Sequence, residues 1–182
     1  ARGEPVALLV AGDICGVQKF LYSISSEGAA RALRGRSVYL QLVTEAVAQY
    51  VLDRVGLPVT NLLYAGGGNF YLLAQTKPDA ALAHLHAEIT RKLWDAHEGH
   101  LRLAMAWMPV SAADFKIGKF ATVWDELHER LRRAKERPLA ELGQDATQLV
   151  GGSHSAGGHV PTCPICGREE MRLKEGEVCR LC

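Results

Sequence analysis

Four cysteines near the C-terminal end of the sequence have the spacing of a metal site. They form two C-x-x-C pairs separated by twelve residues: Cys163 with Cys166, and Cys179 with Cys182. One tight turn of this kind presents two thiolates to a single metal ion. Two such turns therefore supply the four corners of a tetrahedron, which is the ligand set that zinc prefers. A thioredoxin-like redox motif would need only one such pair, so the sequence predicts a zinc site.

A four-cysteine site leaves no open coordination position, so the predicted zinc is structural. It would hold together residues 161–182, which are too few to build a hydrophobic core of their own. His154 and His159 are the alternative ligands. The fifth cysteine, Cys15, has no histidine close to it in sequence, and we interpret it as a small, partly buried side chain rather than a nucleophile.

The second candidate site combines a strand end with a glycine-rich turn. An apolar run ends at Gly12-Asp13, and two short apolar runs flank Gly66-Gly67-Gly68-Asn69, which is typical of a hairpin. In polymerase and cyclase palm domains, carboxylates at these two places hold two metal ions. Here only Asp13 is acidic, and one carboxylate cannot organise two magnesium ions. We therefore expect no nucleotidyl transfer by this palm alone, and a helix N-cap is the alternative role of Asp13.

Hydrophobic periodicity predicts the elements that position these residues. Strands are expected at 6–10, 61–64, 70–74 and 101–107, the last closed by Pro109; helices are expected at 18–22, 30–55, 76–97 and 119–137. The order of the long elements is the ferredoxin-like βαββαβ pattern of an α+β protein, with helices on one face of an antiparallel sheet and an extra C-terminal helix. This fold hosts many functions, so it decides none of them.

Composition separates a main domain from a small appendage. The 182 residues are 48% hydrophobic and 23% charged, which suits a globular protein of this size. We expect a palm domain at 1–142, a linker rich in glycine and serine at 143–160, and a zinc ribbon or knuckle module at 161–182. The chain starts with alanine and ends on an expected metal ligand, so we interpret it as a segment of a longer polypeptide.

Charge and hydropathy constrain location and partners. The net charge of +1 gives no overall attraction to nucleic acid. The local basic runs at 31–36 and 130–137 are typical of solvated helix faces. There is neither an apolar run of membrane-spanning length nor a signal segment, so we expect a cytoplasmic protein without membrane contact.

Three motifs in order resemble the large subunit of type III CRISPR effector complexes. Residues 12–20 are similar to that family's G-D-I-S-G-I-Q-x-F segment, with Cys15 in place of the usual serine. Residues 33–40 resemble its L-[RK]-x-R-S-x-Y-L helix start, and residues 61–70 its N-x-[LI]-x-x-G-G-G-x-F hairpin. A four-cysteine module after the palm is also usual in the family. The wording of the motifs favours the III-A branch over III-B.

The resemblance implies a parent protein with an HD nuclease domain, two palms, the cysteine module and a helical domain. Binding of target RNA would switch on cleavage of single-stranded DNA and synthesis of cyclic oligoadenylates from ATP with magnesium. Because the second palm of the family carries the G-G-D-D acids, this sequence resembles the first palm. Its implied partners are the second palm, the other subunits of the complex, and the CRISPR RNA and target RNA that the complex holds.

Carried over by position, the resemblance implies eight residues at the border of the nucleotide pocket: Asp13, Ile14, Cys15, Gly16, Gly66, Gly67, Gly68 and Asn69. Arg34 and Arg36 would meet phosphate or the neighbouring palm, with plain helix solvation as the alternative. The competing hypotheses are a stand-alone RNA- or protein-binding module that uses the zinc knuckle, and an autonomous cyclase. The missing acids of the hairpin count against the autonomous cyclase.

Overall fold

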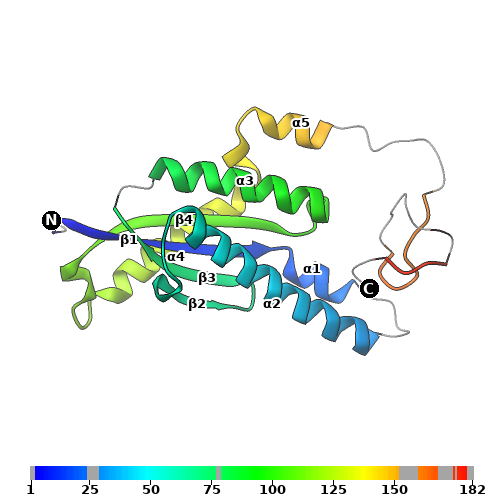
Figure 1. The fold of residues 1–182 in the computed structure, drawn as a ribbon, viewed down its shortest axis with the longest axis horizontal. Helices are drawn as coiled ribbons and strands as arrows, with labels where there is room; N and C mark the ends of the chain where they lie inside the picture. Colours follow the sequence, from blue (N-terminus) through cyan, green and yellow to red (C-terminus); the bar gives the residue numbers. More distant parts are fainter. Residues whose placement is uncertain are drawn as a thin grey trace.

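The structure is a computed structural model of the chain, and it describes residues 3–23, 29–76, 79–151, 160–167, 174 and 176–179. Its centre is a sheet of four antiparallel strands in the order β2-β3-β1-β4 (Figure 1). The strands are β1 Pro5–Cys15, β2 Leu62–Gly66, β3 Asn69–Ala74 and β4 Arg102–Ser111. This order along the chain and across the sheet confirms the predicted ferredoxin-like α+β class.

Five α-helices of the described residues surround the sheet. They are α1 Val17–Tyr22, α2 Ala29–Arg54, α3 Asp79–His97, α4 Phe120–Glu136 and α5 Asp145–Gly151. Short 3-10 helices at 59–61, 112–115 and 140–142 connect them. No helix of the described segments is long and apolar enough to cross a lipid bilayer.

The central strand β1 has a buried side chain on both faces, which explains its continuous apolar sequence. Leu8, Val10 and Ile14 belong to the core that β1 shares with α2 and α3. Leu9 and Ala11 point to the opposite face and pack in a second core with α4. Successive side chains of a strand alternate between faces, so one run of apolar residues supports two cores. The extra helix α4 thus covers the face of the sheet that α2 and α3 leave uncovered.

The predicted ends of two strands were wrong. Strand β1, expected to end at residue 10, continues to Cys15. Strand β4 does not stop at Pro109 but continues to Ser111, and Pro109 pairs with Leu8. A proline is tolerated there because β4 is an edge strand, whose outer side needs no backbone donor. Residues 145–151 were expected in a linker but form α5, which Arg91 of α3 holds through an ion pair of 2.6 Å with Asp145. Residues 152–159 of that linker, and residues 77 and 78 at the start of the third expected helix, lie outside the described residues.

We expect a side chain at position 12 to destabilise the fold. A Cβ on Gly12 would lie 2.1 Å from the Phe70 ring, which is fully buried, so Gly12→Ala should lower the free energy of unfolding by about 2 kcal/mol. Urea denaturation measures this loss. The matched control is Gly35→Ala, since Gly35 is an exposed position of α2 with open space around it. There the helix should gain about 0.5–1 kcal/mol, and equal effects of the two variants would contradict the packing argument.

Candidate nucleotide site and metal centre

The hairpin between β2 and β3 turns in two residues. Gly67 and Gly68 have φ angles of 61° and 90°, and Gly66 and Asn69 close the ladder as a pair. Two successive residues with positive φ define the type I′ turn that matches the twist of a hairpin, and only glycine adopts such angles without strain. Gly67 and Gly68 are therefore explained by the turn, and the hairpin predicted from the sequence is present.

The turn lies against the end of β1. Asp13 pairs with Asn69 across the sheet, and the backbone N–H of Ile14 donates to the Gly68 carbonyl oxygen at 2.7 Å. A Cβ at Gly68 would approach Val17 to 3.3 Å, so α1 also closes on the turn. The structure thus brings together the strand end and the hairpin, which are more than fifty residues apart in sequence.

Gly16 makes the step from β1 into α1. It has a φ of 92° as the N-cap of α1, and a Cβ there would lie 2.1 Å from the carbonyl oxygen of His100. The backbone therefore approaches the loop before β4 more closely than any other residue type would allow. Asp13 is not the cap of this helix, so the N-cap interpretation of its side chain was wrong.

Asp13 instead points toward α4. Its Oδ2 accepts a hydrogen bond of 2.7 Å from Nζ of Lys135, and the Asp13 side chain is only 16% exposed. Lys135 was not identified from the sequence, because it lies 122 positions away within a basic run and no motif marks it. The carboxylate that the sequence singled out is thus already paired with a cation of the same chain.

Cys15 lies on the same face and is partly buried. Burial, followed by the negative charge of Asp13, raises the pKa of the Cys15 thiol. The Sγ atom is 3.8 Å from both the carbonyl oxygen and Oδ1 of Asp13, so its hydrogen-bond partners are acceptors. The positive charges of Arg102 and Lys135 oppose the rise in pKa but do not reverse it. A thiol in this setting stays protonated and is a poor nucleophile, in agreement with the interpretation from sequence.

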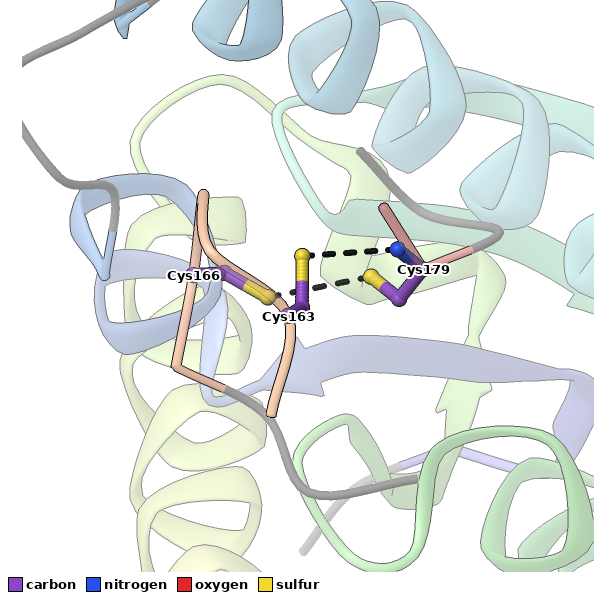
Figure 2. A group of neighbouring side chains, drawn as sticks. All are labelled: Cys163, Cys166 and Cys179. Carbon is purple, nitrogen blue, oxygen red and sulfur yellow. Dashed lines mark hydrogen bonds between the residues drawn. The ribbon is translucent and has the colours of Figure 1, made fainter. Parts of the chain in front are cut away.

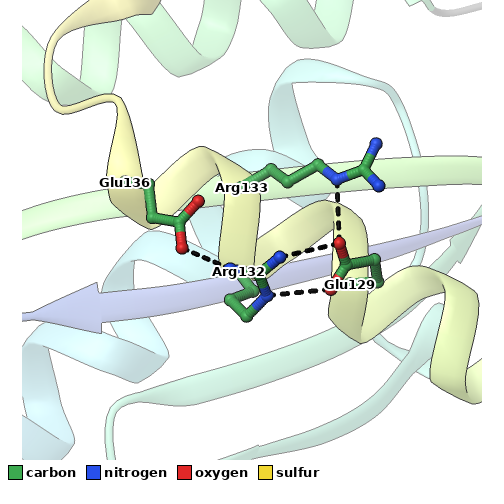
Figure 3. Close-up of polar contacts among 4 residues, drawn as sticks. All are labelled: Glu129, Arg132, Arg133 and Glu136. Carbon is green, nitrogen blue, oxygen red and sulfur yellow. Dashed lines mark hydrogen bonds and ion pairs between the residues drawn. The ribbon is translucent and has the colours of Figure 1, made fainter.

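The basic run of α4 is balanced by acids one turn away (Figure 3). Arg132 donates to both carboxylate oxygens of Glu129 at 2.8 Å, and Arg133 Nε donates to Oε1 of the same carboxylate at 2.9 Å. These hydrogen bonds, that of Arg132 first, lower the pKa of Glu129 to about 2. Arg132 also pairs with Glu136. Apart from Lys135, which pairs with Asp13 of β1, the run is therefore a solvated helix face whose arginines 130, 132 and 133 pair within α4, as the sequence indicated.

The two arginines of the other basic run differ in exposure. Arg34 is exposed, whereas Arg36 is 3% exposed and reaches α1. Its Nη1 donates to the backbone carbonyl of Phe20 and, at 3.1 Å, to Oγ of Ser23, while the guanidinium stacks on the Phe20 ring. The helix-solvation alternative was wrong for Arg36, which binds the C-terminal end of α1.

Three of the predicted metal ligands converge (Figure 2). The Sγ atoms of Cys163, Cys166 and Cys179 lie within 4.8 Å of one another, and those of Cys166 and Cys179 are 3.7 Å apart. Zinc–sulfur bonds of about 2.3 Å in a tetrahedron place two sulfurs about 3.8 Å apart, whereas a disulfide needs about 2.05 Å. The three thiols therefore fit a zinc ion. Cys182, His154 and His159 lie outside the described residues.

The backbone around these cysteines favours thiolates. Burial opposes ionisation of the Cys163 thiol, but hydrogen bonds from backbone amides, led by that of Cys179, outweigh it and lower its pKa to about 6. The Cys179 N–H lies 3.4 Å from Cys163 Sγ. Gly167, with a φ of 67°, donates its N–H to the Cys163 carbonyl at 2.8 Å and closes the turn. Because a metal binds the thiolate and not the thiol, this turn is prepared for a cation.

The fold and the site together define the class of protein: a ferredoxin-like palm domain with a cysteine centre beside it. Within that class, the family model described as Csm1 subunit domain B matches residues 6–151. The chain belongs to this family. The resemblance to the large subunit of type III CRISPR complexes is thereby confirmed.

Relatives of known function agree with the family. The chain is 34% identical over 180 residues to the CRISPR system single-strand-specific deoxyribonuclease Cas10/Csm1 (subtype III-A) of Thermococcus onnurineus, covering 97% of the chain and 22% of that protein. It is 36% identical over 187 residues to the protein of the same name from Streptococcus thermophilus, covering 98% and 24%. The chain thus spans less than a quarter of the length of these relatives.

Solved structures of the family share the fold. A Csm1–Csm4 cassette in complex with cA3 matches with a TM-score of 0.70 and 33% identity, over 82% of the chain and 22% of the other chain. A cassette in complex with one ATP gives the same TM-score, identity and coverage.

We expect Asp13 and Lys135 to be energetically coupled. In a double-mutant cycle of Asp13→Asn and Lys135→Met, the coupling energy should be about 0.5–1 kcal/mol, because one partner is largely buried. Chemical denaturation of the four variants measures it. Lys119, an exposed lysine at the N-terminal end of the same helix, is the control, and Asp13→Asn with Lys119→Met should be additive. Additive effects for the Lys135 cycle as well would contradict the assignment.

Proposed function

We propose that this chain is the first palm and cysteine module of the large subunit of a type III-A CRISPR effector complex. In this role it forms one wall of the site where ATP is joined into cyclic oligoadenylates. The observation that carries the proposal is the convergence of Asp13–Gly16 with the Gly66–Asn69 turn. Solved cassettes of the family that hold ATP, cA3 and cA4 support it.

The proposed role as a wall of the site rests on two features: the strand end and turn lack the further carboxylates that catalysis needs, and their backbones pack closely together. The turn offers backbone groups and an amide but no carboxylate, and Asp13 is paired with Lys135. These residues do not fit a pair of magnesium ions, which would require further carboxylates. The acids that hold magnesium would come from the second palm, and this chain would contribute shape and backbone polar groups.

The wider activity belongs to the whole protein. The relatives are named as single-strand-specific deoxyribonucleases, and the solved cassettes pair Csm1 with Csm4. We propose the same assembly for the parent of this chain, with a Csm4-like subunit, CRISPR RNA and target RNA as partners and single-stranded DNA as the nuclease substrate. The nuclease site would lie in the rest of the parent.

We also propose a division of the chain into a palm at 1–142, a connection at 143–160 and a metal module at 161–182. The 3-10 helix before α5 packs against α3, with Leu142 buried, and α5 is tied to α3 by the ion pair between Arg91 and Asp145. The first part of the connection therefore stays with the palm. The family match, which extends to residue 151, supports this.

We expect Gly67→Ala to impair cyclic oligoadenylate synthesis by the full-length subunit in its complex. Nothing lies within 4 Å of a Cβ at Gly67, so the methyl group would project from the turn into open space. In our proposal the nucleotide occupies this space. A displacement of about 1 Å at a reacting centre can cost about a hundredfold, so a loss of roughly tenfold or more is expected. Conversion of labelled ATP, started by target RNA, measures it.

The control variant places alanine at another glycine with a positive φ angle, far from the turn. Gly118 also has a positive φ, of 81°, and open space around it, but it lies in the loop before α4. Gly118→Ala should leave synthesis at the wild-type rate. Equal rates for Gly67→Ala and wild type, with both variants folded, would overturn the role of the turn.

We propose that the cysteine centre holds structural zinc. The purified chain should carry about one zinc ion, and Cys163→Ser should lose it, because a serine hydroxyl does not replace a thiolate ligand. Elemental analysis after desalting measures the content. Cys15→Ser is the matched control and should retain the metal, since Cys15 lies in β1 outside the cluster. Zinc-free wild-type protein, or equal loss in both variants, would contradict the proposal.

A further inference from the structure

A cavity of about 220 Å³ lies between the palm and the cysteine centre. Its palm side is lined by Lys19 of α1, Arg36 of α2 and His100, which precedes β4. Its other side is lined by Cys166 and Cys179. Three residues with nitrogen-bearing side chains, from separate parts of the palm, therefore line the same cavity as two of the cysteines.

The charge of a loaded cysteine centre explains this arrangement. With Cys182 as the fourth ligand predicted from the sequence, four thiolates carry four negative charges and a zinc ion two positive ones, so the complete site would have a net charge of −2. Such a charge beside a protein surface is stabilised by nearby cations and N–H donors, and it repels anions. A phosphate group in this cavity would meet the thiolates directly, so the cationic side chains do not indicate an anion site.

We propose that Lys19, Arg36 and His100 form the outer shell of the metal centre, balancing the charge of the zinc thiolates and holding the module on the palm. The inference rests on the proposed zinc. Arg36 is a rigid part of this shell, because it is buried and tied to Phe20 and Ser23 at the end of α1. Lys19 is exposed at its rim and is the member that can be changed without disturbing the core.

The test measures how fast zinc leaves the intact, zinc-loaded chain. Lys19→Gln removes one charge and Lys19→Glu reverses it, so release to a chromogenic chelator should be about threefold and about tenfold faster, respectively. Lys19→Arg keeps the charge and should release zinc at the wild-type rate. Raising the salt from 0.05 to 0.5 M should shrink the differences, because the interaction is screened.

Two controls separate charge balance from general damage. Arg34→Glu reverses an exposed charge two residues before Arg36, outside the cavity lining, and should release zinc at the wild-type rate. The thermal unfolding of the palm in the Lys19 variants should match wild type. Equal release by Lys19→Glu, Arg34→Glu and wild type would overturn the inference while leaving the zinc site intact. If the wild-type chain binds no zinc, both the proposed zinc site and this inference are wrong.

Discussion

The hydrogen bond from the Ile14 N–H to the Gly68 carbonyl joins the two segments from which the candidate nucleotide site is built. It forms because β1 and the β2–β3 hairpin pair in one register, with Gly12 opposite Phe70 and Asp13 opposite Asn69. The register in turn depends on the absence of a side chain at Gly12, where the Phe70 ring covers the backbone. A shift by one residue would turn every buried side chain of β1 to the other face, so the site and the two cores are specified together.

The long elements could be predicted from the sequence because their apolar residues repeat with a clear period. The failures occurred where the deciding contact lies far away in the chain. The strand β4 continues past Pro109 because it is at the edge of the sheet, and the order of strands cannot be read from β4 itself. Helix α5 is too short to show a period, and its ion pair to Arg91 spans 54 residues.

In the candidate sites, too, local sequence patterns could be predicted and contacts between distant residues could not. The cysteine spacing, the glycine turn and the strand end are local patterns. The structure brings the turn to the strand end, and it brings together Cys163, Cys166 and Cys179. The partners that set their electrostatics are not local: Lys135 reaches Asp13 from the last turn of α4, and Arg36 is buried although it lies within a basic run. A sequence shows that a lysine or arginine is present, but only packing decides whether it is solvated or structural.

The ion pair between Asp13 and Lys135 explains why this palm would border the nucleotide site without binding magnesium itself. A lysine ammonium 2.7 Å from the only carboxylate of the strand end and turn already supplies the positive charge that a metal ion would bring. Magnesium gives up its water reluctantly and would have to displace this lysine with a single carboxylate as compensation. The palm therefore keeps its ferredoxin-like backbone, while the one acid of its strand end and turn is paired with a lysine of the same chain. Such a surface can face a triphosphate held by another domain's metal ions, because it adds no unpaired carboxylate that would repel the phosphates.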